Sequence, residues 1–251
     1  MAHDYHILKH WNDWLSQQFL GAELLQAEKQ ALETLLARHF GKHVLLIGVD
    51  QQLGLLEATH LMQRTLFTPL LAQHSGVRCI EGSLRELPIL SGSVDLVLLP
   101  HTLEFVDNPQ QLLAESCRII KPEGLIAVVG FNPYSWWGLT RMINRQREMP
   151  WKANIIFAHQ IKNWLGLADF EMEEHQSVLF RPPASRVVTY KRLSFLERVG
   201  KRCLPMSGGV YLLTARAKVT PLTPIRLKWQ QRLTGIRIPT TLPGSIARQV
   251  D

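Results

Sequence analysis

Three side chains that could do polar chemistry follow directly after an apolar segment in the middle of the chain. Segment 94–99 is typical of a strand buried on both faces, and His101, Glu104 and Asp107 come immediately after it. Open α/β sheets bind ligands at the carboxyl ends of their strands. Because histidine titrates near neutral pH, His101 is the first candidate for a general base; the alternative is that it holds its loop through hydrogen bonds. Glu104 and Asp107 are expected to stabilise the loop and the start of the next helix.

The elements that must position these residues form a strand, a helix and a second strand. Asn108 can cap a helix and Pro109 suits the first helical turn, so a helix is predicted over 110–120. Residues 121–124 are predicted to end it before a second apolar strand, 125–131. A short helix between two apolar strands indicates a parallel sheet and therefore an α/β fold.

Several segments, taken in order, resemble the class I S-adenosylmethionine-dependent methyltransferases, especially the small-molecule group that includes quinone-ring methylases. They are VRCIEGSLRELP at 77–88, VDLV at 94–97, HTLEFVDNP at 101–109, LAE at 113–115 and LIAVVGFNP at 125–133. The resemblance implies a Rossmann-like doubly wound sheet, mostly parallel with an antiparallel C-terminal hairpin, preceded by N-terminal helices. It also implies S-adenosyl-L-methionine as the cofactor, with S-adenosyl-L-homocysteine as the product.

The resemblance assigns cofactor binding to the loops after the first, third and fourth strands, and the first strand is expected at 42–47. Its glycine-rich turn, normally Asp-x-Gly-x-Gly-x-Gly, is replaced here by GVDQQLG at 48–54, where only the first glycine keeps the pattern. The implied cofactor-binding residues are Gly48, Val49, Asp50, Gly82, Ser83, Leu84, Pro100, His101 and Leu103.

Two further departures affect the same site. Segment 59–71 lacks the acidic residue that holds the ribose hydroxyls in the family, and Ser83 replaces the Asp that accepts a hydrogen bond from the adenine amino group. A hydroxyl can accept that bond more weakly than a carboxylate. Two interpretations stay open: a divergent enzyme, or a domain that kept its fold and lost its ligand.

The chain divides into an N-terminal helical cap at 1–40, a methyltransferase-like domain at 41–219 and a basic tail at 220–251. Apolar residues at helical spacing in the cap indicate packing on the core, with a substrate lid as the alternative. A helix from 157 ending near 167 and strands at 170–179 and 209–217 would complete the sheet. An insertion at about 181–206 should contain a short helix at 193–199.

The segment FNPYSWWGL at 131–139 follows the last parallel strand and should border the acceptor cleft. It resembles a Gly-Phe-Asn-Pro-x-Ser-x-x-Gly-Leu signature in a little-characterised bacterial branch of these methyltransferases. Trp136 and Trp137 could form a flat wall against a planar or hydrophobic acceptor, or could anchor a connecting helix.

Charge is distributed unevenly along the chain. Segment 176–250 holds 14 Lys and Arg against one Glu, a formal charge of +13, within a chain of net charge +7. Three interpretations of the basic C-terminal region stay open: a solvated arm, docking on RNA, or docking on an anionic membrane.

Composition bounds the remaining possibilities. A chain of 251 residues with 46% hydrophobic content can bury one large core without disulfides. Cys79, Cys117 and Cys203 lack CxxC spacing and indicate reduced thiols in a cytoplasmic protein. A secretion signal, a membrane span and a metal site are not expected.

The sequence therefore predicts an S-adenosylmethionine-dependent methyltransferase acting on a small or lipid-like acceptor. The alternatives are a non-catalytic binding or scaffold protein with the same fold, and an RNA methyltransferase that uses the basic C-terminal region.

Overall fold

The computed structural model describes residues 2–70, 77–144, 154–184 and 187–218. Residues 1–219 form one compact unit. The basic tail at 220–251 lies outside the described residues.

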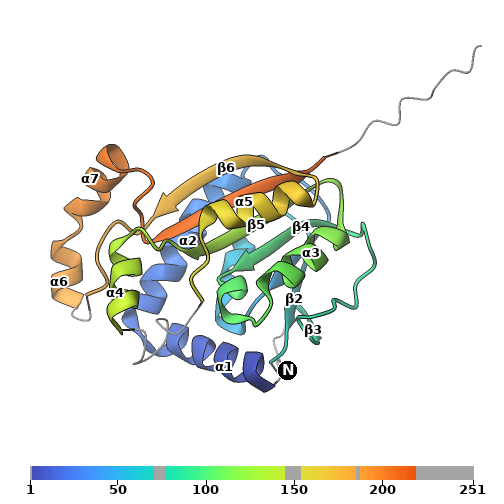
Figure 1. Ribbon diagram of the computed structural model, residues 1–251, viewed down its shortest axis with the longest axis horizontal. Coiled ribbons are helices and arrows are strands. Elements are labelled where there is room, and N and C mark those ends of the chain that lie inside the picture. The colour runs from blue at the N-terminus through green and yellow to red at the C-terminus, as the bar shows by residue number, and fades with distance from the viewer. Residues whose placement is uncertain (1, 71–76, 145–153, 185–186, 219–251) are drawn as a thin grey trace, which may run out of the picture. The chain divides into compact units, whose positions relative to one another are not determined.

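A seven-stranded sheet in the order β3-β2-β1-β4-β5-β7-β6 forms the centre of this unit (Figure 1). The strands are β1 (His43–Ile47), β2 (Gln63–Thr68), β3 (Arg78–Glu81), β4 (Val94–Pro100), β5 (Ile120–Phe131), β6 (Phe170–Val178) and β7 (Val210–Ala217). β1 to β5 pair in parallel, and β7 lies antiparallel between β5 and β6. The predicted fold, a mostly parallel Rossmann-like sheet with an antiparallel C-terminal hairpin, is confirmed.

Helices cover both faces of this sheet (Figure 1). α3 (Pro109–Ile119) and α5 (Ala158–Leu167) pack on each other over one face, while α2 (Phe19–Leu36) and the 3₁₀ segment η1 (Asp50–Ala58) lie over the other. The central strands β1 and β4 are almost continuously apolar and buried, as strands covered on both sides must be.

The strand–helix–strand unit forms as predicted, with one difference. Asn108 caps α3, since its Oδ1 accepts a hydrogen bond from the Gln111 N–H at 3.2 Å, and Pro109 is the first helical residue. The following strand begins at Ile120, not at 125, because Ile120 is buried and pairs with Val94 before the register shifts. The segment expected to be a turn is therefore the irregular start of β5.

The N-terminal stripe packs on the core. It forms two helices, α1 (Ala2–Gln17) and α2, and buries Trp11, Leu15, Leu24 and Leu32. α1 also contacts the loops at the carboxyl edge of the sheet, since Asn12 Oδ1 accepts a hydrogen bond from the Gln51 N–H at 3.2 Å. α1 thus covers the place where the sequence predicts the cofactor.

The insertion differs from the single short helix predicted at 193–199. It contains α6 (Val187–Arg192) and α7 (Phe195–Cys203), which Figure 1 shows on the same side of the molecule as α4 (Trp136–Asn144). The seven-residue segment contained too few turns for its boundaries to be read from periodicity.

Within the described residues, no helix is long and apolar enough to cross a membrane. The same residues contain no group of three or more His, Cys, Asp or Glu side chains that could hold a metal ion. Cys79, Cys117 and Cys203 are free thiols.

Candidate active site at the carboxyl edge

The predicted site residues lie at one edge of the sheet because parallel strands place their carboxyl ends together. The loop after β1 stays close to β2, where the Gly48 N–H donates to Phe67 O at 3.1 Å. The loop after β4 stays close to β5, where the His101 N–H donates to Val129 O at 2.8 Å. Gly82 extends the same edge beyond β3 and donates to Thr68 O at 3.2 Å.

His101 lies at the centre of a buried charged network. Its Nε2 is 2.6 Å from Glu28 Oε1 and its Nδ1 is 3.0 Å from Glu104 Oε2, and all three side chains are almost completely excluded from solvent. Glu28 comes from α2 on one side and Glu104 from the 3₁₀ segment η2 (Thr102–Phe105) on the other. His101 has a left-handed backbone, φ 57°, which turns the chain directly after β4.

This environment decides the charge of His101. Burial acts to lower its pKa, but the Glu28 and Glu104 carboxylates outweigh burial and raise the pKa to about 9. The imidazole is therefore protonated near neutral pH and donates a hydrogen bond to each carboxylate. A protonated, fully buried imidazole cannot take a proton from an acceptor, so the geometry favours the loop-holding interpretation of His101 over the general base.

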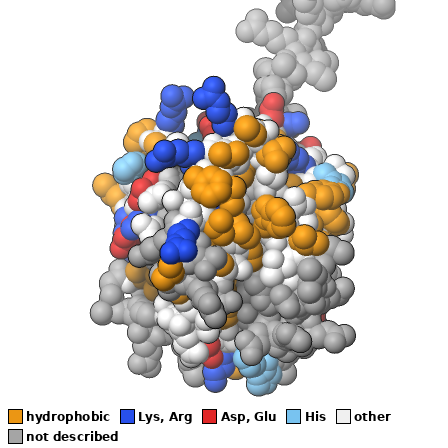
Figure 2. Space-filling view, turned by 90° about the vertical axis from the view of Figure 1, so that its left-hand side faces the viewer, with side chains coloured by type: hydrophobic (Ala, Val, Ile, Leu, Met, Phe, Trp, Pro, Cys, Tyr) orange, Lys and Arg blue, Asp and Glu red, His pale blue; other side chains and the backbone are white. Residues whose placement is uncertain are grey.

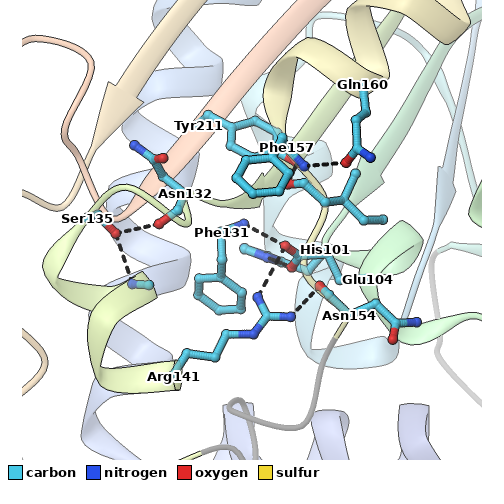
Figure 3. Close-up of polar contacts among 12 residues, drawn as sticks. His101, Glu104, Phe131, Asn132, Ser135, Arg141, Asn154, Phe157, Gln160 and Tyr211 are labelled. Atoms are coloured by element: carbon cyan, nitrogen blue, oxygen red, sulfur yellow. Dashed lines mark hydrogen bonds and ion pairs between the residues drawn. The ribbon is translucent and has the colours of Figure 1, made fainter. Parts of the chain in front are cut away.

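Glu104 extends the network to β5, to α4 and to the segment at Asn154 (Figure 3). Its Oε1 accepts a hydrogen bond from the Phe131 N–H at 2.9 Å and lies 3.7 Å from Arg141 Nη1. Arg141 in turn donates to the backbone carbonyl of Asn154, whose N–H donates to Glu104 O at 2.7 Å. Two cations and two carboxylates thus balance inside the protein, which is what buried charges require.

Sequence reasoning missed two members of this network. Glu28 carried a signal, because it interrupts the apolar stripe of α2 at the position between Leu24 and Leu32, one turn from each. Arg141 carries the same signal on α4, one turn after the buried Trp137. A lone charge on an apolar helix face therefore indicated a buried ion pair in both cases.

Gln52 occupies the space in front of the altered glycine turn. Its side chain is 1% exposed. Its Oε1 accepts a hydrogen bond from the Val49 N–H at 3.0 Å, and its Nε2 donates to Pro100 O at 2.8 Å. The side chain thus bridges the ends of β1 and β4 and uses backbone groups of two residues that the sequence assigned to the cofactor.

The same side chain explains Gly48. A Cβ atom at position 48 would overlap Gln52 Oε1, so a side chain there would displace Gln52 from its hydrogen bonds even without a ligand. In this conformation the Gln52 side chain is bonded to the Val49 N–H and the Pro100 carbonyl, so a cofactor that used either group would have to displace it.

The remaining cofactor candidates differ in their exposure. Ser83 is partly buried and its Oγ accepts a hydrogen bond from the Arg85 N–H at 3.3 Å. Leu84 and Leu103 are buried, and Asp50 is partly buried at the first residue of η1. Asp107 lies 3.7 Å from Arg85 in an exposed ion pair.

The two tryptophans after β5 differ in exposure: Trp137 fits the role of a helix anchor, and Trp136 does not. Trp137 is buried, stacks on Phe131 at 5.9 Å and donates through Nε1 to Arg181 O at 2.9 Å, so it anchors α4. Trp136 is 59% exposed. Asn132 and Ser135 make the turn itself, since Ser135 Oγ donates to Asn132 O at 2.6 Å and accepts from the Gly138 N–H at 3.1 Å (Figure 3).

Comparison with known proteins agrees with this geometry. Residues 31–128 match the family model described as "Methyltransferase domain". The match is to a methyltransferase domain over these residues, and the observed sheet order agrees with the predicted class I methyltransferase fold.

One curated protein is similar to this chain in sequence. The chain is 31% identical over 141 residues to the uncharacterised protein YafS of Escherichia coli (strain K12), a match that covers 55% of the chain and 54% of YafS. The chain therefore matches about half the length of this curated relative.

Two solved structures share the fold at low sequence identity. One is a Thermotoga maritima protein described as an S-adenosylmethionine-dependent methyltransferase and possible histamine N-methyltransferase (20% identity, TM-score 0.63, covering 86% of this chain and all of that one). The other is an S-adenosylmethionine-dependent methyltransferase from Mesorhizobium loti (15% identity, TM-score 0.53, covering 74% of this chain and 96% of that one).

Proposed function

We propose that this chain transfers a methyl group from S-adenosyl-L-methionine to a small or lipid-like acceptor. The observation that carries the proposal is the methyltransferase domain at 31–128, which includes the carboxyl ends of β1 to β4 where such domains hold their ligand. The residues proposed to hold the cofactor are Gly48, Val49, Asp50, Gly82, Ser83, Leu84, Pro100, His101 and Leu103. The three free cysteines support a cytoplasmic location for such an enzyme.

The proposed roles follow from the chemistry that the cofactor supplies. S-adenosyl-L-methionine carries its methyl group on a sulfonium, so the protein has mainly to align the acceptor and exclude water. His101 is assigned a positioning role: it fixes the turn after β4 between Glu28 and Glu104. No general base is assigned.

A second candidate function is a binding or scaffold protein that uses the same sheet without the cofactor. Gln52 favours it, because its side chain satisfies the Val49 N–H and the Pro100 carbonyl that a ligand at this edge would use. The two candidate functions differ in whether the cofactor displaces the Gln52 side chain from these backbone groups.

Calorimetric titration with S-adenosyl-L-methionine and S-adenosyl-L-homocysteine separates these candidates. The informative variant is Gln52→Ala, which frees both backbone groups. The matched control is Gln51→Ala, whose side chain is exposed while its N–H still bonds Asn12.

The methyltransferase proposal expects micromolar binding to the wild-type chain. It also expects Gln52→Ala to bind roughly thirtyfold more tightly, since two competing hydrogen bonds of about 1 kcal/mol each are removed and about 1.4 kcal/mol corresponds to a factor of ten. Absence of binding to both chains at millimolar ligand would overturn the proposal and leave the scaffold function. Binding to Gln52→Ala alone would show that the native chain closes its own site.

The RNA methyltransferase remains an alternative for the acceptor, with the tail at 220–251 as the docking element. Removing that tail should abolish retention on RNA and leave cofactor binding unchanged. Full retention after the removal would exclude the tail as the RNA contact.

A further inference from the structure

Helix α7 presents apolar side chains to solvent. Its inner side is fixed by Glu197, which accepts hydrogen bonds from the Phe180 N–H at 3.2 Å and from Arg181 Nε at 3.1 Å. Gly200 lies on the same inner side, where a Cβ atom would overlap the Phe180 ring. Phe195 and Val199, one turn apart, are exposed.

Neighbouring segments carry further exposed apolar side chains. Leu204 and Met206 follow α7 in the chain, and the Met206 carbonyl accepts a hydrogen bond from Asn132 Nδ2 at 2.7 Å, which places this turn beside the start of α4. Six large apolar side chains here are between 48% and 63% exposed: Trp136, Leu139, Phe195, Val199, Leu204 and Met206. We call these six the α4–α7 face.

Basic side chains accompany the α4–α7 face. Segment 187–209 contains five Lys and Arg against one Glu. Arg192, Arg198, Lys201 and Arg202 are exposed, while the single acid, Glu197, is paired with Arg181. Figure 2 shows this side of the molecule, where hydrophobic side chains gather over the centre with Lys and Arg side chains beside them.

We propose that the α4–α7 face docks on an anionic lipid bilayer. Exposed aliphatic side chains on a short amphipathic helix can enter the region between headgroups and acyl chains, and the flanking basic side chains then meet the lipid phosphates. α7 has nine residues, so it would lie in the plane of the surface. Single-stranded RNA is a poorer match, because it binds to stacked aromatic rings and four of the six side chains are aliphatic.

The face lies next to the carboxyl edge of the sheet. α4 follows the end of β5, and the Asn132 N–H donates to Gly209 O at 2.9 Å just before β7 begins. Docking would therefore turn the edge that carries the candidate active site toward the bilayer, which suits a lipid-like acceptor. This last step rests on the proposed function, whereas the docking itself does not.

The test is co-sedimentation of the full-length chain with vesicles at low ionic strength and without cofactor. One vesicle is phosphatidylcholine alone, and the other also contains phosphatidylglycerol. The apolar variant is Phe195→Ser with Val199→Ser, and the charge variant is Arg198→Glu with Arg202→Glu. Matched controls change exposed residues elsewhere: Met62→Ser with Leu167→Ser, and Arg38→Glu with Arg78→Glu.

The proposal expects the wild-type chain to sediment with anionic vesicles and to stay in solution with neutral ones. Each variant of the face should weaken binding by on the order of tenfold or more, and salt should weaken the wild-type interaction. The controls should stay within about twofold of the wild type. All these chains keep the basic tail, so its contribution is constant.

Three results would overturn the proposal. They are no binding of the wild-type chain to anionic vesicles, equal binding by the wild type and both variants of the face, and retention on RNA without vesicle binding. Because no cofactor is present, none of them bears on the calorimetric titration, and the two proposals can fail separately.

Discussion

The buried position of His101 predicts a loss of stability as the pH rises from neutral to about 9. The groups that face it are Glu28 from α2 and Glu104 from η2, with Arg141 from α4 beyond Glu104. Burial lowers the pKa of His101, but the two carboxylates raise it by more, so the pKa is about 9 against an ordinary value of 6.5. The folded protein therefore holds a proton that the unfolded chain has released.

The sign and size of the effect follow from this difference. A raised pKa in the folded state contributes stability that is fully present below pH 6.5 and is lost as the pH rises through 9. Each pKa unit corresponds to about 1.4 kcal/mol, so about 3 kcal/mol of unfolding free energy should disappear between these limits. That is a large part of the stability of a typical domain.

Urea unfolding at several pH values between 6 and 9 measures this loss, with His101→Asn as the reference. Asparagine tolerates the left-handed backbone at position 101 and does not titrate. The difference in unfolding free energy between wild type and variant should shrink by about 3 kcal/mol across the range.

A second variant tests the cause. Glu28→Gln removes one carboxylate and keeps a side chain of the same size, so the loss of stability should begin at lower pH than in the wild type. Wild-type and His101→Asn curves that run parallel from pH 6 to 9 would refute the reasoning, because His101 would then carry no extra proton in the folded state.

Three further predictions concern the surroundings of the site. Gly48→Ala should lower the free energy of unfolding by about 1–3 kcal/mol, and adding Gln52→Ala should recover most of that loss. A double-mutant cycle by urea unfolding measures this coupling, and additive effects of the two substitutions would mean that the two side chains do not touch. Asn132→Ala removes the side-chain N–H donor of the Met206 and Gly208 carbonyls and should lower the melting temperature by about 4–8 °C. An unchanged melting temperature would show that these two hydrogen bonds do not stabilise the fold. Burial raises the pKa of the partly buried Cys117 to about 12, so at pH 8 a thiol reagent should modify the exposed Cys203 at least tenfold faster. Equal rates would mean that Cys117 is as accessible and as reactive as Cys203.

The fold was predictable because each element carried its own local signal. Continuous apolar segments at β1 and β4 indicated strands covered on both sides, and Asn108-Pro109 marked the start of α3 within one residue. The boundaries of α7 and β5 were less predictable. Those depend on tertiary contacts, such as the pairing of Ile120 with Val94, that no local pattern encodes.

The site was predictable only in part. The position of His101 after β4 placed it at the ligand edge, but its partner Glu28 lies 73 residues away in the chain. The protonation state depends on that partner more than on the loop motif. A histidine in a ligand-binding loop titrates near neutrality only if its neighbours leave it near its ordinary pKa, and two carboxylates do not.

Gly48 illustrates the limit of motif reasoning most directly. In the family, the glycines of this turn let the backbone approach the cofactor, and the resemblance therefore assigned Gly48 to the cofactor. Here the space next to Gly48 is filled by Gln52, and the same absence of a Cβ atom leaves room for an internal side chain. A single retained glycine therefore does not distinguish a turn that binds the cofactor from a turn that is filled by an internal side chain. The discriminating group is Gln52: if it is displaced by the ligand, the sheet edge is an active site, and if it is not, the same hydrogen bonds close that edge permanently.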